Sequence, residues 1–295
     1  LQSEPSNAIR NHLRDYCSAK SLPYYNIREH SGLMRNLIVR TSTTGDVMVI
    51  VVFAQRSEEI VPLLENLREN FPQITSLMYC INEKFNDTLG DQDIKCFAGK
   101  DHIEERMTSF DGKGELRFKI RPKTFYQTNS LQAEKLYHQA AEFAGITKDD
   151  IVYDLYTGCG TIANYVASLS KKVVGIEYVE DAVEDARLNS EFNNINNTTF
   201  FAGDMAKILT EEFIEQNGRP DVIITDPPRA GMAESVINQL LATKARKIVY
   251  ISCNPATQAR DLVLLQSKYA VGRIRPVDMF PHTQHVENIV ELILK

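Results

Sequence analysis

Short apolar runs recur through the second half of the chain, and each ends in polar or turn-forming residues. They occupy residues 151–156, 172–177, 198–204, 221–228 and 247–252. Segments with the apolar spacing of amphipathic helices lie between them, such as 161–170 and 180–194. Strands that alternate with helices of about 10–15 residues predict βαβ units and a parallel sheet. We therefore expect a Rossmann-like α/β domain over residues 121–295, with helices on both faces of a mostly parallel sheet.

The first part of the chain has a different pattern. Two apolar runs flank a Thr-Thr-Gly-Asp turn within residues 32–55, which predicts a β-hairpin. Three further short apolar runs predict strands, at 74–83, 93–99 and 114–120. We expect a smaller α+β domain over residues 1–120.

One helix is predicted in this smaller domain, over residues 57–71. Ser57 is its expected N-cap, because a hydroxyl can accept a hydrogen bond from the first free backbone N–H groups. Glu58 and Glu59 would then fall in the first turn, where the helix dipole favours acidic side chains.

The polar ends of the predicted parallel strands indicate a ligand site, because such sheets bind ligands at the carboxyl ends of their strands. The first strand runs into the Gly-rich turn Thr157–Gly160, where glycine lets backbone approach a ligand. Glu177 ends the second strand, in the place of an acid that binds ribose hydroxyls, and Asp204 ends the third. These ends predict a pocket for an adenosine-containing ligand. The turn by itself leaves a dinucleotide and a smaller adenosyl ligand open.

The last two strand ends carry the candidate chemistry. Asp226 precedes two prolines that fix the backbone, which suits either a rigid turn or a group held against a reacting atom. Cys253 ends the fifth strand beside Asn-Pro, either as a small packed side chain or as a nucleophile. Glu287 opens the final apolar run, where a carboxylate can act as a general base.

Composition and charge narrow the classes of protein. The chain has 295 residues, a net charge of −6, and no apolar run of the roughly 20 residues that span a membrane. Its five cysteines are scattered without a C-x-x-C pair, which argues against structural zinc or a disulfide framework and favours a reducing cytoplasm. His282 and His285 lack a third ligand at a recognisable spacing, so we expect no metal site.

One ordered basic stripe offers a contact for nucleic acid. Arg117, Lys119 and Arg121 alternate with apolar residues on a predicted strand. Most such stripes are solvated strand faces, but this one leads into Phe-Tyr-Gln-Thr-Asn at 125–129. Aromatic and amide side chains there could line a cleft for a base or an adenosine.

Six segments together resemble the motifs of RNA uracil-5-methyltransferases. In order they are FYQTN, DLYTGCGT, GIE, TDPPRAG, YISCNPATQARD and MFPHTQHVE. The resemblance covers about 120–295 and implies transfer of a methyl group from S-adenosylmethionine to C5 of a uridine in RNA. It implies that Cys253 is the nucleophile that adds to C6 and that Glu287 removes the C5 proton.

The resemblance also bears on the remaining site residues. Asp226 matches a position that contacts the cofactor and the uracil edge. Separately from the resemblance, we hypothesise that Arg229 stabilises the enolate or binds a phosphate. Phe125 and the basic stripe are expected to contact RNA. The cofactor contacts expected from the motifs are Gln127, Tyr156, Gly158, Thr161, Glu177, Asp204 and Asp226.

Two departures from the family pattern lead to further expectations. Nothing resembles the small RNA-binding β-barrel with which many members begin, and the chain does not start with Met, so we expect that an upstream region was trimmed. The closely spaced cysteines that bind an iron–sulfur cluster in many members are also missing, so we expect no cluster in this chain. No obligate protein partner is predicted.

Several alternatives compete with this interpretation. An amino-methyltransferase would carry an aromatic residue where Arg229 stands, and an RNA cytosine-5 enzyme would carry a cysteine in the Asp-Pro-Pro motif. A non-catalytic RNA-binding module would leave Cys253 and Glu287 without a role. The segments SCNPAT and MFPHTQHVE are more similar to bacterial 23S ribosomal RNA enzymes, so ribosomal RNA is the expected substrate and the tRNA T-loop the alternative.

Overall fold

The computed structural model describes residues 4–295 and divides into two compact units. The N-terminal unit holds the residues up to Glu105 together with Lys119–Lys123, and the C-terminal unit holds Arg106–Phe118 and Thr124–Lys295. The chain passes between them after Glu105, Phe118 and Lys123, whereas the sequence predicts one boundary near residue 120. The roles expected of the two domains stay predictions.

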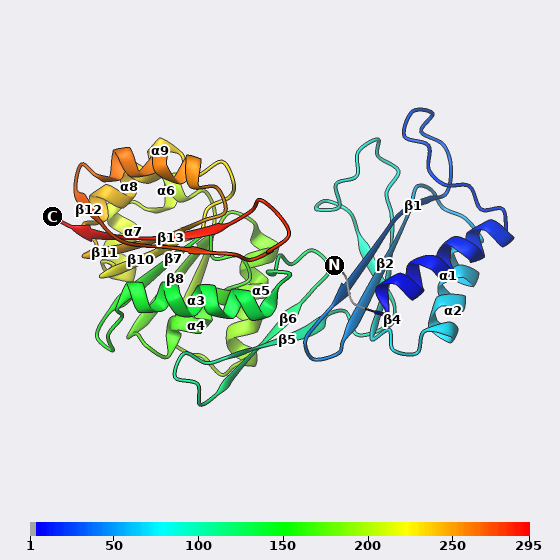
Figure 1. Cartoon of the computed structure of the whole chain (residues 1–295), viewed down its shortest axis with the longest axis horizontal. Helices are drawn as coiled ribbons and strands as arrows, with labels where there is room; N and C mark the ends of the chain where they lie inside the picture. Colours follow the sequence, from blue (N-terminus) through cyan, green and yellow to red (C-terminus); the bar gives the residue numbers. More distant parts are fainter. Residues whose placement is uncertain (1–3) are drawn as a thin grey trace. The chain divides into compact units, whose positions relative to one another are not determined.

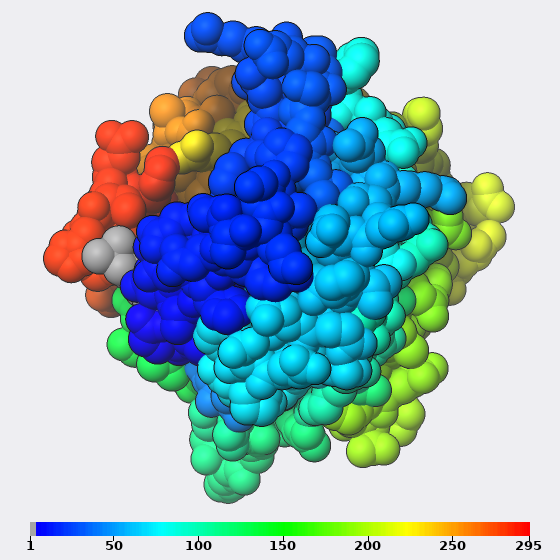
Figure 2. Space-filling view, turned by 90° about the vertical axis from the view of Figure 1, so that its right-hand side faces the viewer, coloured from blue at the N-terminus to red at the C-terminus, as the bar shows by residue number. Residues whose placement is uncertain are grey.

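The N-terminal unit is a four-stranded sheet covered by two helices. The strand order is β1-β2-β3-β4, with β2 parallel to β3 and the other pairs antiparallel. Every residue of β2 is buried, and alternate residues of this strand share an apolar core with α1 and α2: Val47, Val49, Val51 and Phe53. Figure 2 shows α1 (dark blue) and α2 (light blue) side by side on the surface of this unit. The elements are α1 Ser6–Ala19, β1 Met34–Thr41, β2 Val47–Phe53, α2 Ile60–Asn70, β3 Ser76–Ile81 and β4 Ile94–Gly99.

The predicted hairpin and strands of this unit are present, but the start of the predicted helix is wrong. Helix α2 begins at Ile60 with Glu59 as its N-cap, and its first turn holds no acidic residue. The Ser57 hydroxyl instead accepts a hydrogen bond from the Glu59 backbone N–H, at 3.2 Å. The serine therefore closes a turn that precedes the helix, so Glu58 and Glu59 lie outside its first turn.

A two-stranded sheet of β5 (Ile103–Thr108) and β6 (Glu115–Ile120) follows β4, and the chain then enters a seven-stranded sheet. The order of that sheet is β12-β13-β11-β10-β7-β8-β9. The pairs from β11 to β9 are parallel, whereas β13 is antiparallel to both of its neighbours. The strands are β7 Ile151–Leu155, β8 Lys172–Glu177, β9 Thr198–Ala202, β10 Val222–Thr225, β11 Lys247–Ser252, β12 Tyr269–Val277 and β13 Glu287–Leu294.

Helices cover both faces of this sheet. Helices α3 and α4 lie on one face and α8 and α9 on the other (Figure 1). The helices are α3 Ser130–Ala144, α4 Thr161–Ala167, α5 Glu180–Phe192, α6 Met205–Ile208, α7 Glu211–Asn217, α8 Glu234–Thr243 and α9 Pro255–Leu265. The mostly parallel sheet with helices on both faces confirms the predicted fold class. None of the helices in the described part of the chain is long and apolar enough to cross a bilayer.

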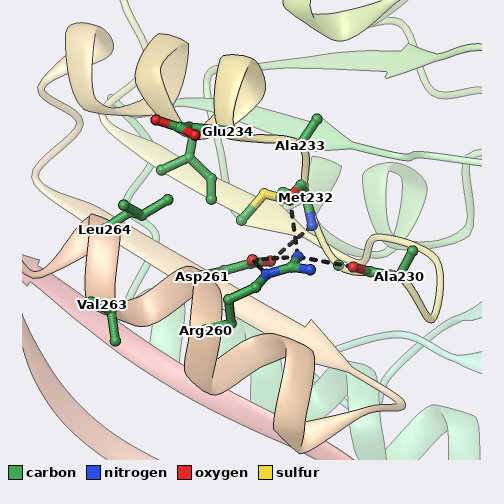
Figure 3. Close-up of a pocket in the computed structure, with 10 residues that line it drawn as sticks. Ala230, Met232, Ala233, Glu234, Arg260, Asp261, Val263 and Leu264 are labelled. Carbon is green, nitrogen blue, oxygen red and sulfur yellow. Dashed lines mark hydrogen bonds and ion pairs between the residues drawn. The ribbon is translucent and has the colours of Figure 1, made fainter.

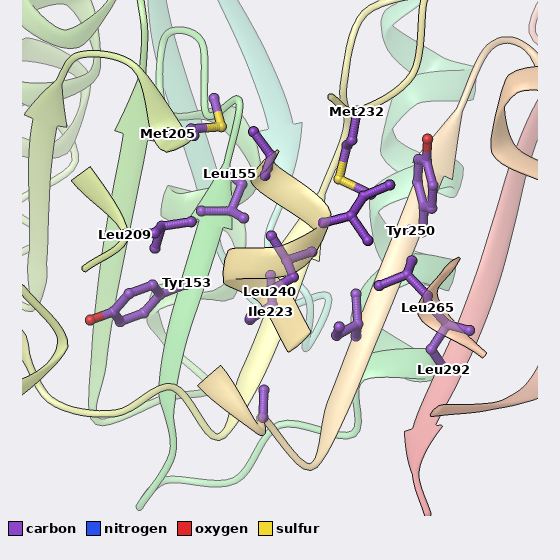
Figure 4. Packing of buried hydrophobic residues seen from close by; sticks show 14 of the residues in the cluster. Tyr153, Leu155, Met205, Leu209, Ile223, Met232, Leu240, Tyr250, Leu265 and Leu292 are labelled. Carbon is purple, nitrogen blue, oxygen red and sulfur yellow. The ribbon is translucent and has the colours of Figure 1, made fainter. Parts of the chain in front are cut away.

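The core of the C-terminal unit forms where α8 packs on the sheet. Leu240 of α8 lies against the sheet residues Leu155 and Ile223 (Figure 4). All four residues of β10 are buried, as expected for a central strand covered on both faces. The packing of Phe200 in β9 explains why β8 has a glycine at position 175. A Cβ on Gly175 would lie 2.5 Å from the Phe200 ring. The Phe200 ring therefore fills the space that a side chain at this position would need.

Candidate active site

The parallel strands β7 to β11 end at one edge of the sheet, and the loops that follow them carry most of the predicted site residues. The predicted strands at 198–204 and 221–228 end earlier than expected, at Ala202 and Thr225. Asp204 and Asp226 are therefore in loops beyond the sheet, where their side chains are free of the strand ladder. Polar side chains at this edge can face a common ligand.

The Gly-rich loop after β7 is ordered by a buried carboxylate that the sequence analysis missed. Oδ2 of Asp154 accepts hydrogen bonds from the Thr157 hydroxyl, at 2.5 Å, and from the Ala163 backbone N–H, at 2.9 Å. Tyr156 and Gly158 both have positive φ angles, of 61° and 54°. No atom lies within 4 Å of the position that a Cβ on Gly158 would take, so this turn leaves open space beside its backbone.

Asp154 itself is fully buried, and burial raises its pKa to about 7. Its second oxygen, Oδ1, is buried without a hydrogen-bond partner among the described residues. A buried acceptor without a partner is uncommon in folded proteins. The available signal was the single acid inside the apolar run IVYDLY, since a charge in a buried strand needs a local reason.

Glu177 at the end of β8 is held by backbone N–H groups. Its Oε2 accepts from Gly158, at 3.1 Å, and its Oε1 accepts from Tyr178 and Val179, at 2.8 and 3.0 Å. The Gly-rich loop and the second strand end are thereby joined. Asp204 caps α6 through a 3.0 Å bond from the Ala206 N–H, so one oxygen serves the helix.

The other predicted cofactor contacts lie around the same loop. Tyr156 is partly buried, and burial followed by the charges of Asp261, Asp204 and Glu177 raises its pKa to about 12. Thr161 is buried, and its hydroxyl lies 3.3 Å from Sγ of Cys159. Sγ of Cys159 in turn donates to the Phe125 carbonyl at 3.4 Å, which brings the segment with Phe125 and Gln127 to the loop. Phe125 is 72% exposed.

Strand pairing brings Cys253 and Glu287 to the same place. In the antiparallel pair β11–β13, Ser252 lies opposite Asn288. The next position along β11 is Cys253, and the preceding position on β13 is Glu287. The register therefore makes the thiol and this carboxylate neighbours at the site edge. Asn254 follows the thiol and caps α9, accepting from the Ala256 N–H at 3.2 Å.

The charges around Cys253 are coupled. Burial raises the pKa of the thiol above its usual range, and the carboxylates of Glu287 and Asp226 raise it further. The guanidinium of Arg229 opposes this effect. Burial also raises the pKa of Glu287, and it raises that of Asp226 well above normal together with the charge of Glu287. The three acidic groups therefore share one electrostatic site.

Three loops of the site are tied to one another by hydrogen bonds. The Arg229 guanidinium donates to the His285 ring at 2.7 Å, which links the loop after β10 to the loop before β13. The Arg229 carbonyl accepts from the Asn254 side chain and the Thr257 hydroxyl, each at 3.1 Å. These hydrogen bonds thus hold together three segments that are distant in sequence: TDPPRAG, SCNPAT and MFPHTQHVE.

A buried carboxylate, Asp261, supports the loop after β10 from behind, beside a pocket of about 740 Å³ (Figure 3). It accepts from the Met232 N–H at 2.8 Å and from the Tyr250 hydroxyl at 2.7 Å. Arg260 pairs with it at 2.7 Å and also donates to the Ala230 carbonyl at 2.9 Å. Sequence patterns gave no signal for this role, because Met232 and Tyr250 lie on other elements, and the neighbouring Arg260 alone does not indicate it.

Gln258 supports the start of β13, and the sequence analysis missed it too. This buried side chain donates to the Tyr250 carbonyl at 2.9 Å and to the Asn288 carbonyl at 3.1 Å. Its oxygen accepts from the Asn288 side chain at 2.7 Å. The residue after Glu287 is therefore held on both its backbone and its side chain.

The predicted basic stripe is split between the two units. Arg117 belongs to the C-terminal unit, where its guanidinium lies 5.0 Å from the Phe192 ring centroid. Lys119 and Arg121 belong to the N-terminal unit and are partly buried. As predicted, exposed or partly buried basic side chains alternate with the buried Phe118 and Ile120. Within residues 4–295, no three His, Cys, Asp or Glu side chains are grouped to hold a metal ion.

Comparisons with known proteins place this arrangement in a family. Residues 90–295 match the model of the family described as tRNA (Uracil-5-)-methyltransferase. A Bacteroides thetaiotaomicron protein named "Uncharacterized RNA methyltransferase" is 54% identical over 299 residues, which cover 100% of this chain and 64% of that protein. A Porphyromonas gingivalis protein with the same name is 55% identical and covers 99% of this chain and 63% of its own length.

A solved structure agrees with these relatives. The Pyrococcus abyssi tRNA (uracil-54, C5)-methyltransferase, in complex with S-adenosyl-L-homocysteine, is 30% identical with a TM-score of 0.77. The match covers 96% of this chain and 66% of that one. The chain thus spans slightly less than two thirds of the length of the relatives that it matches. With a family match over more than half of its residues, the chain belongs to the family of RNA uracil-5-methyltransferases.

Proposed function

We propose that this chain methylates C5 of a uridine in RNA and takes the methyl group from S-adenosylmethionine. One observation carries the proposal: Ser252 pairs with Asn288, so a thiol and a partly buried carboxylate adjoin at the sheet edge that also holds the Gly-rich loop. A rigid packing role for Cys253 would not require a neighbouring carboxylate whose pKa is raised by burial.

The residues suit a covalent route. The thiolate of Cys253 adds to C6 of uracil, and the electron pair of the C5=C6 bond moves to make C5 nucleophilic. S-adenosylmethionine supplies the methyl group when bound. Glu287 then takes the proton from C5, the C5=C6 bond forms again, the C6–S bond breaks, and the thiolate leaves. A raised pKa makes Glu287 an effective base for this proton.

Asp226 and Arg229 are assigned supporting roles. Asp226 binds the polar edge of the uracil ring, since its carboxyl group is close enough to Glu287 and Cys253 to interact with their charges. Arg229 favours the thiolate, because its positive charge lowers the pKa of Cys253. The same cation can stabilise the enolate oxygen that develops after addition to C6.

The Gly-rich loop fits an adenosyl ligand. The open space beside Gly158 admits a ligand against the backbone. Glu177 and Asp204 are proposed to bind the ribose hydroxyls and the adenine amino group. The remaining proposed cofactor contacts are Gln127, Tyr156, Thr161 and Asp226.

RNA contacts are proposed for the exposed Phe125 and for Arg117 in the C-terminal unit, and separately for Lys119 and Arg121 in the N-terminal unit. The proposed substrate is 23S ribosomal RNA, on the motifs SCNPAT and MFPHTQHVE. The second candidate is the tRNA T-loop, favoured by the similarity to the Pyrococcus abyssi tRNA (uracil-54, C5)-methyltransferase.

The test uses an RNA stem-loop that carries 5-fluorouridine, with S-adenosylmethionine added. Fluorine replaces the proton that Glu287 removes, so the methylated adduct is trapped and is seen by denaturing gel and intact mass. We expect an adduct that disappears in Cys253→Ala. In Glu287→Gln, ordinary uridine RNA is expected to accumulate the same methylated adduct. The absence of any adduct in a chain that binds S-adenosylmethionine by calorimetry would refute the covalent mechanism.

The choice of RNA is tested separately with in vitro transcripts of 23S ribosomal RNA and tRNA. Mass spectrometry of nuclease fragments is expected to find 5-methyluridine in the ribosomal transcript. Methylation confined to the tRNA T-loop would replace ribosomal RNA by the second candidate without changing the chemistry.

A further inference from the structure

Three aromatic rings meet at two loops of the N-terminal unit that the site does not use. Tyr25 and His30 come from the segment between α1 and β1, and Phe85 comes from the segment between β3 and β4. Phe85 is 72% exposed, His30 is also exposed and Tyr25 is partly buried. We call these three residues the aromatic loop surface. Figure 2 shows the segment before β1 (blue) projecting past α1 within this unit.

The segment before β1 is folded into a fixed shape. The Tyr25 N–H donates to the Met34 carbonyl at 2.8 Å, and the Asn26 N–H donates to the Ser31 carbonyl at 2.7 Å. Gly32 has a φ of +116°, and a Cβ there would lie 2.3 Å from the Tyr24 carbonyl oxygen. The loop therefore needs this glycine, and it presents its rings from a defined backbone.

Arg35 joins this segment to the loop that carries Phe85. Its guanidinium donates to the carbonyls of Asn82, Lys84 and Asn86, at 2.8, 2.5 and 2.5 Å. The same guanidinium lies 4.3 Å from the Tyr25 ring centroid. Five donors in a planar fork make arginine suited to such a clamp. The second loop thus has a fixed position relative to the first.

The rings are ordered across the two loops. The Tyr25 hydroxyl and Nδ1 of His30 are 2.9 Å apart. The His30 and Phe85 ring centroids are 4.2 Å apart, with the planes inclined by 33°. A fixed framework that leaves large apolar side chains in water indicates a binding surface, because folding gains nothing from exposing them. Flat rings in this arrangement suit stacking against nucleobases.

The charges in a pocket near the surface are nearly balanced, so they do little to attract phosphates. A neighbouring pocket of about 370 Å³ has the cations Arg56, Lys84 and Lys95 in its lining, together with the acids Glu83 and Asp93. Lys84 pairs with Asp91, and Lys95 lies 3.7 Å from Asp93. Little net positive charge is left to collect phosphates.

We propose that the aromatic loop surface binds unpaired bases of an RNA single strand, by stacking on the exposed ring of Phe85. This rests on the proposed function only in that RNA is the substrate. Bases that are unstacked and splayed out are the form of RNA that proteins read through aromatic rings. The surface then holds the substrate at a second place, apart from the residues that act on the uridine.

The chain has no tryptophan, so a single Phe85→Trp substitution reports directly on this surface. The probe is a single-stranded oligoadenylate of about 12 nucleotides, a length within the usual range for such sites. We expect saturable quenching of the indole emission, with a dissociation constant on the order of 10 µM. Val61→Trp, on the exposed face of α2 in the same unit, is the matched control and is expected to stay unquenched.

An alanine variant measures the strength of the contact in the protein without tryptophan. Phe85→Ala is expected to weaken oligoadenylate binding about tenfold, since a stacked base is worth about 1–3 kcal/mol. The affinity is expected to fall only slightly with salt, with a slope of about one or two phosphates. Circular dichroism checks that the variants fold.

Three outcomes would overturn the proposal. Oligoadenylate binding without quenching of Phe85→Trp would place the bases elsewhere, and a steep salt slope would assign the binding to phosphates. Emission that shifts to the blue with protein concentration alone would indicate that a second copy covers the surface. The 5-fluorouridine adduct separates this proposal from the proposed function. If Phe85→Ala affects only this surface, the variant still forms the adduct. Quenching without any adduct would support the proposed binding surface and refute the proposed chemistry.

Discussion

The pKa of Cys253 is set by neighbours that act in opposite directions. Burial and two carboxylates oppose the thiolate, whereas Arg229 favours it. Because the net direction is upward, most of the thiol is protonated near neutral pH in the chain without RNA. The rate of attack should therefore rise with pH until the raised pKa is passed.

Replacing Glu287 or Arg229 should change the reactivity of the Cys253 thiol in a definite direction. Glu287→Gln removes a negative charge, so we expect the alkylation of Cys253 by iodoacetamide at neutral pH to become several-fold faster. Arg229→Gln should make it slower. Peptide mass spectrometry measures each thiol separately, and the exposed Cys96 is the internal control. Equal effects of both variants on Cys253 would contradict the assigned charges.

Asp154 should make the stability of the chain depend on pH. Its pKa of about 7 in the folded protein is above the ordinary aspartate value, so the neutral form is favoured by folding. This contribution is complete below about pH 4 and is lost as the pH rises to about 7.

Asp154→Asn should lack that decline. The difference in unfolding free energy between the two proteins, measured with urea at pH 4.5 and 7.5, should change by at most about 4 kcal/mol in favour of the variant. The comparison removes the contributions of other titrating groups, including Asp226 and Glu287. Parallel pH curves for the two proteins would show that Asp154 titrates normally.

At the scale of elements, the position of the antiparallel strand β13 decides where Glu287 lies. It enters the sheet beside β11, and the pairing of Ser252 with Asn288 sets the position of Glu287. A slip of one residue would turn Glu287 to the other face of the sheet. Gln258 prevents this by bonding to the backbone and the side chain of Asn288.

Gln258→Leu should therefore affect one chemical step more than the others. Losing the amide leaves polar groups of Asn288 and Tyr250 unpaired, at about 1–3 kcal/mol of stability. Glu287 loses its fixed position, so we expect methylated adduct to accumulate on uridine RNA while addition of the thiol continues.

The control is Thr243→Val, which removes a buried hydroxyl bonded to the Leu240 carbonyl at the end of α8, before β11 begins. A similar loss of stability without accumulated adduct is expected there. Equal accumulation in both variants would assign the effect to general destabilisation.

Element by element, periodicity predicted what is local. The five parallel strands have short but nearly continuous apolar runs because both faces of the sheet are covered, and these runs were found from the sequence. The strand β12, with its pattern of mostly exposed or partly buried residues, offered no such run and was not predicted. The start of α2 was misplaced for a related reason: Ser57 can cap a helix or close a turn, and the local sequence is the same in both cases.

For the whole molecule, the two compact units should respond differently to a cofactor. The residues proposed to bind S-adenosylmethionine all belong to the C-terminal unit. A ligand that binds only the folded form stabilises it by about 2.7 kcal/mol at a hundredfold excess over its dissociation constant. For a unit of this size, that raises the melting temperature by roughly 5–10 °C.

Differential scanning calorimetry with S-adenosyl-L-homocysteine tests this expectation. We expect two transitions, of which only one moves when the ligand is added. Hydrogen exchange assigns the shifted transition, with new protection in β7, β8 and the Gly-rich loop. A single transition that moves as a whole would indicate that the units unfold together.

The sequence by itself determined the class of fold, the strand ends that carry the site, and the family motifs with Cys253 and Glu287, because these depend on local periodicity and on residues close together in the chain. Only the tertiary structure decided the supporting contacts. Asp261, Gln258 and the pairing of Arg229 with His285 join segments more than ten residues apart or on separate elements. Such contacts leave no periodic trace, since any polar residue that reaches the right place can make them. The aromatic loop surface is of the same kind: Arg35 and Phe85 are 50 residues apart, and only the folded chain brings their loops together.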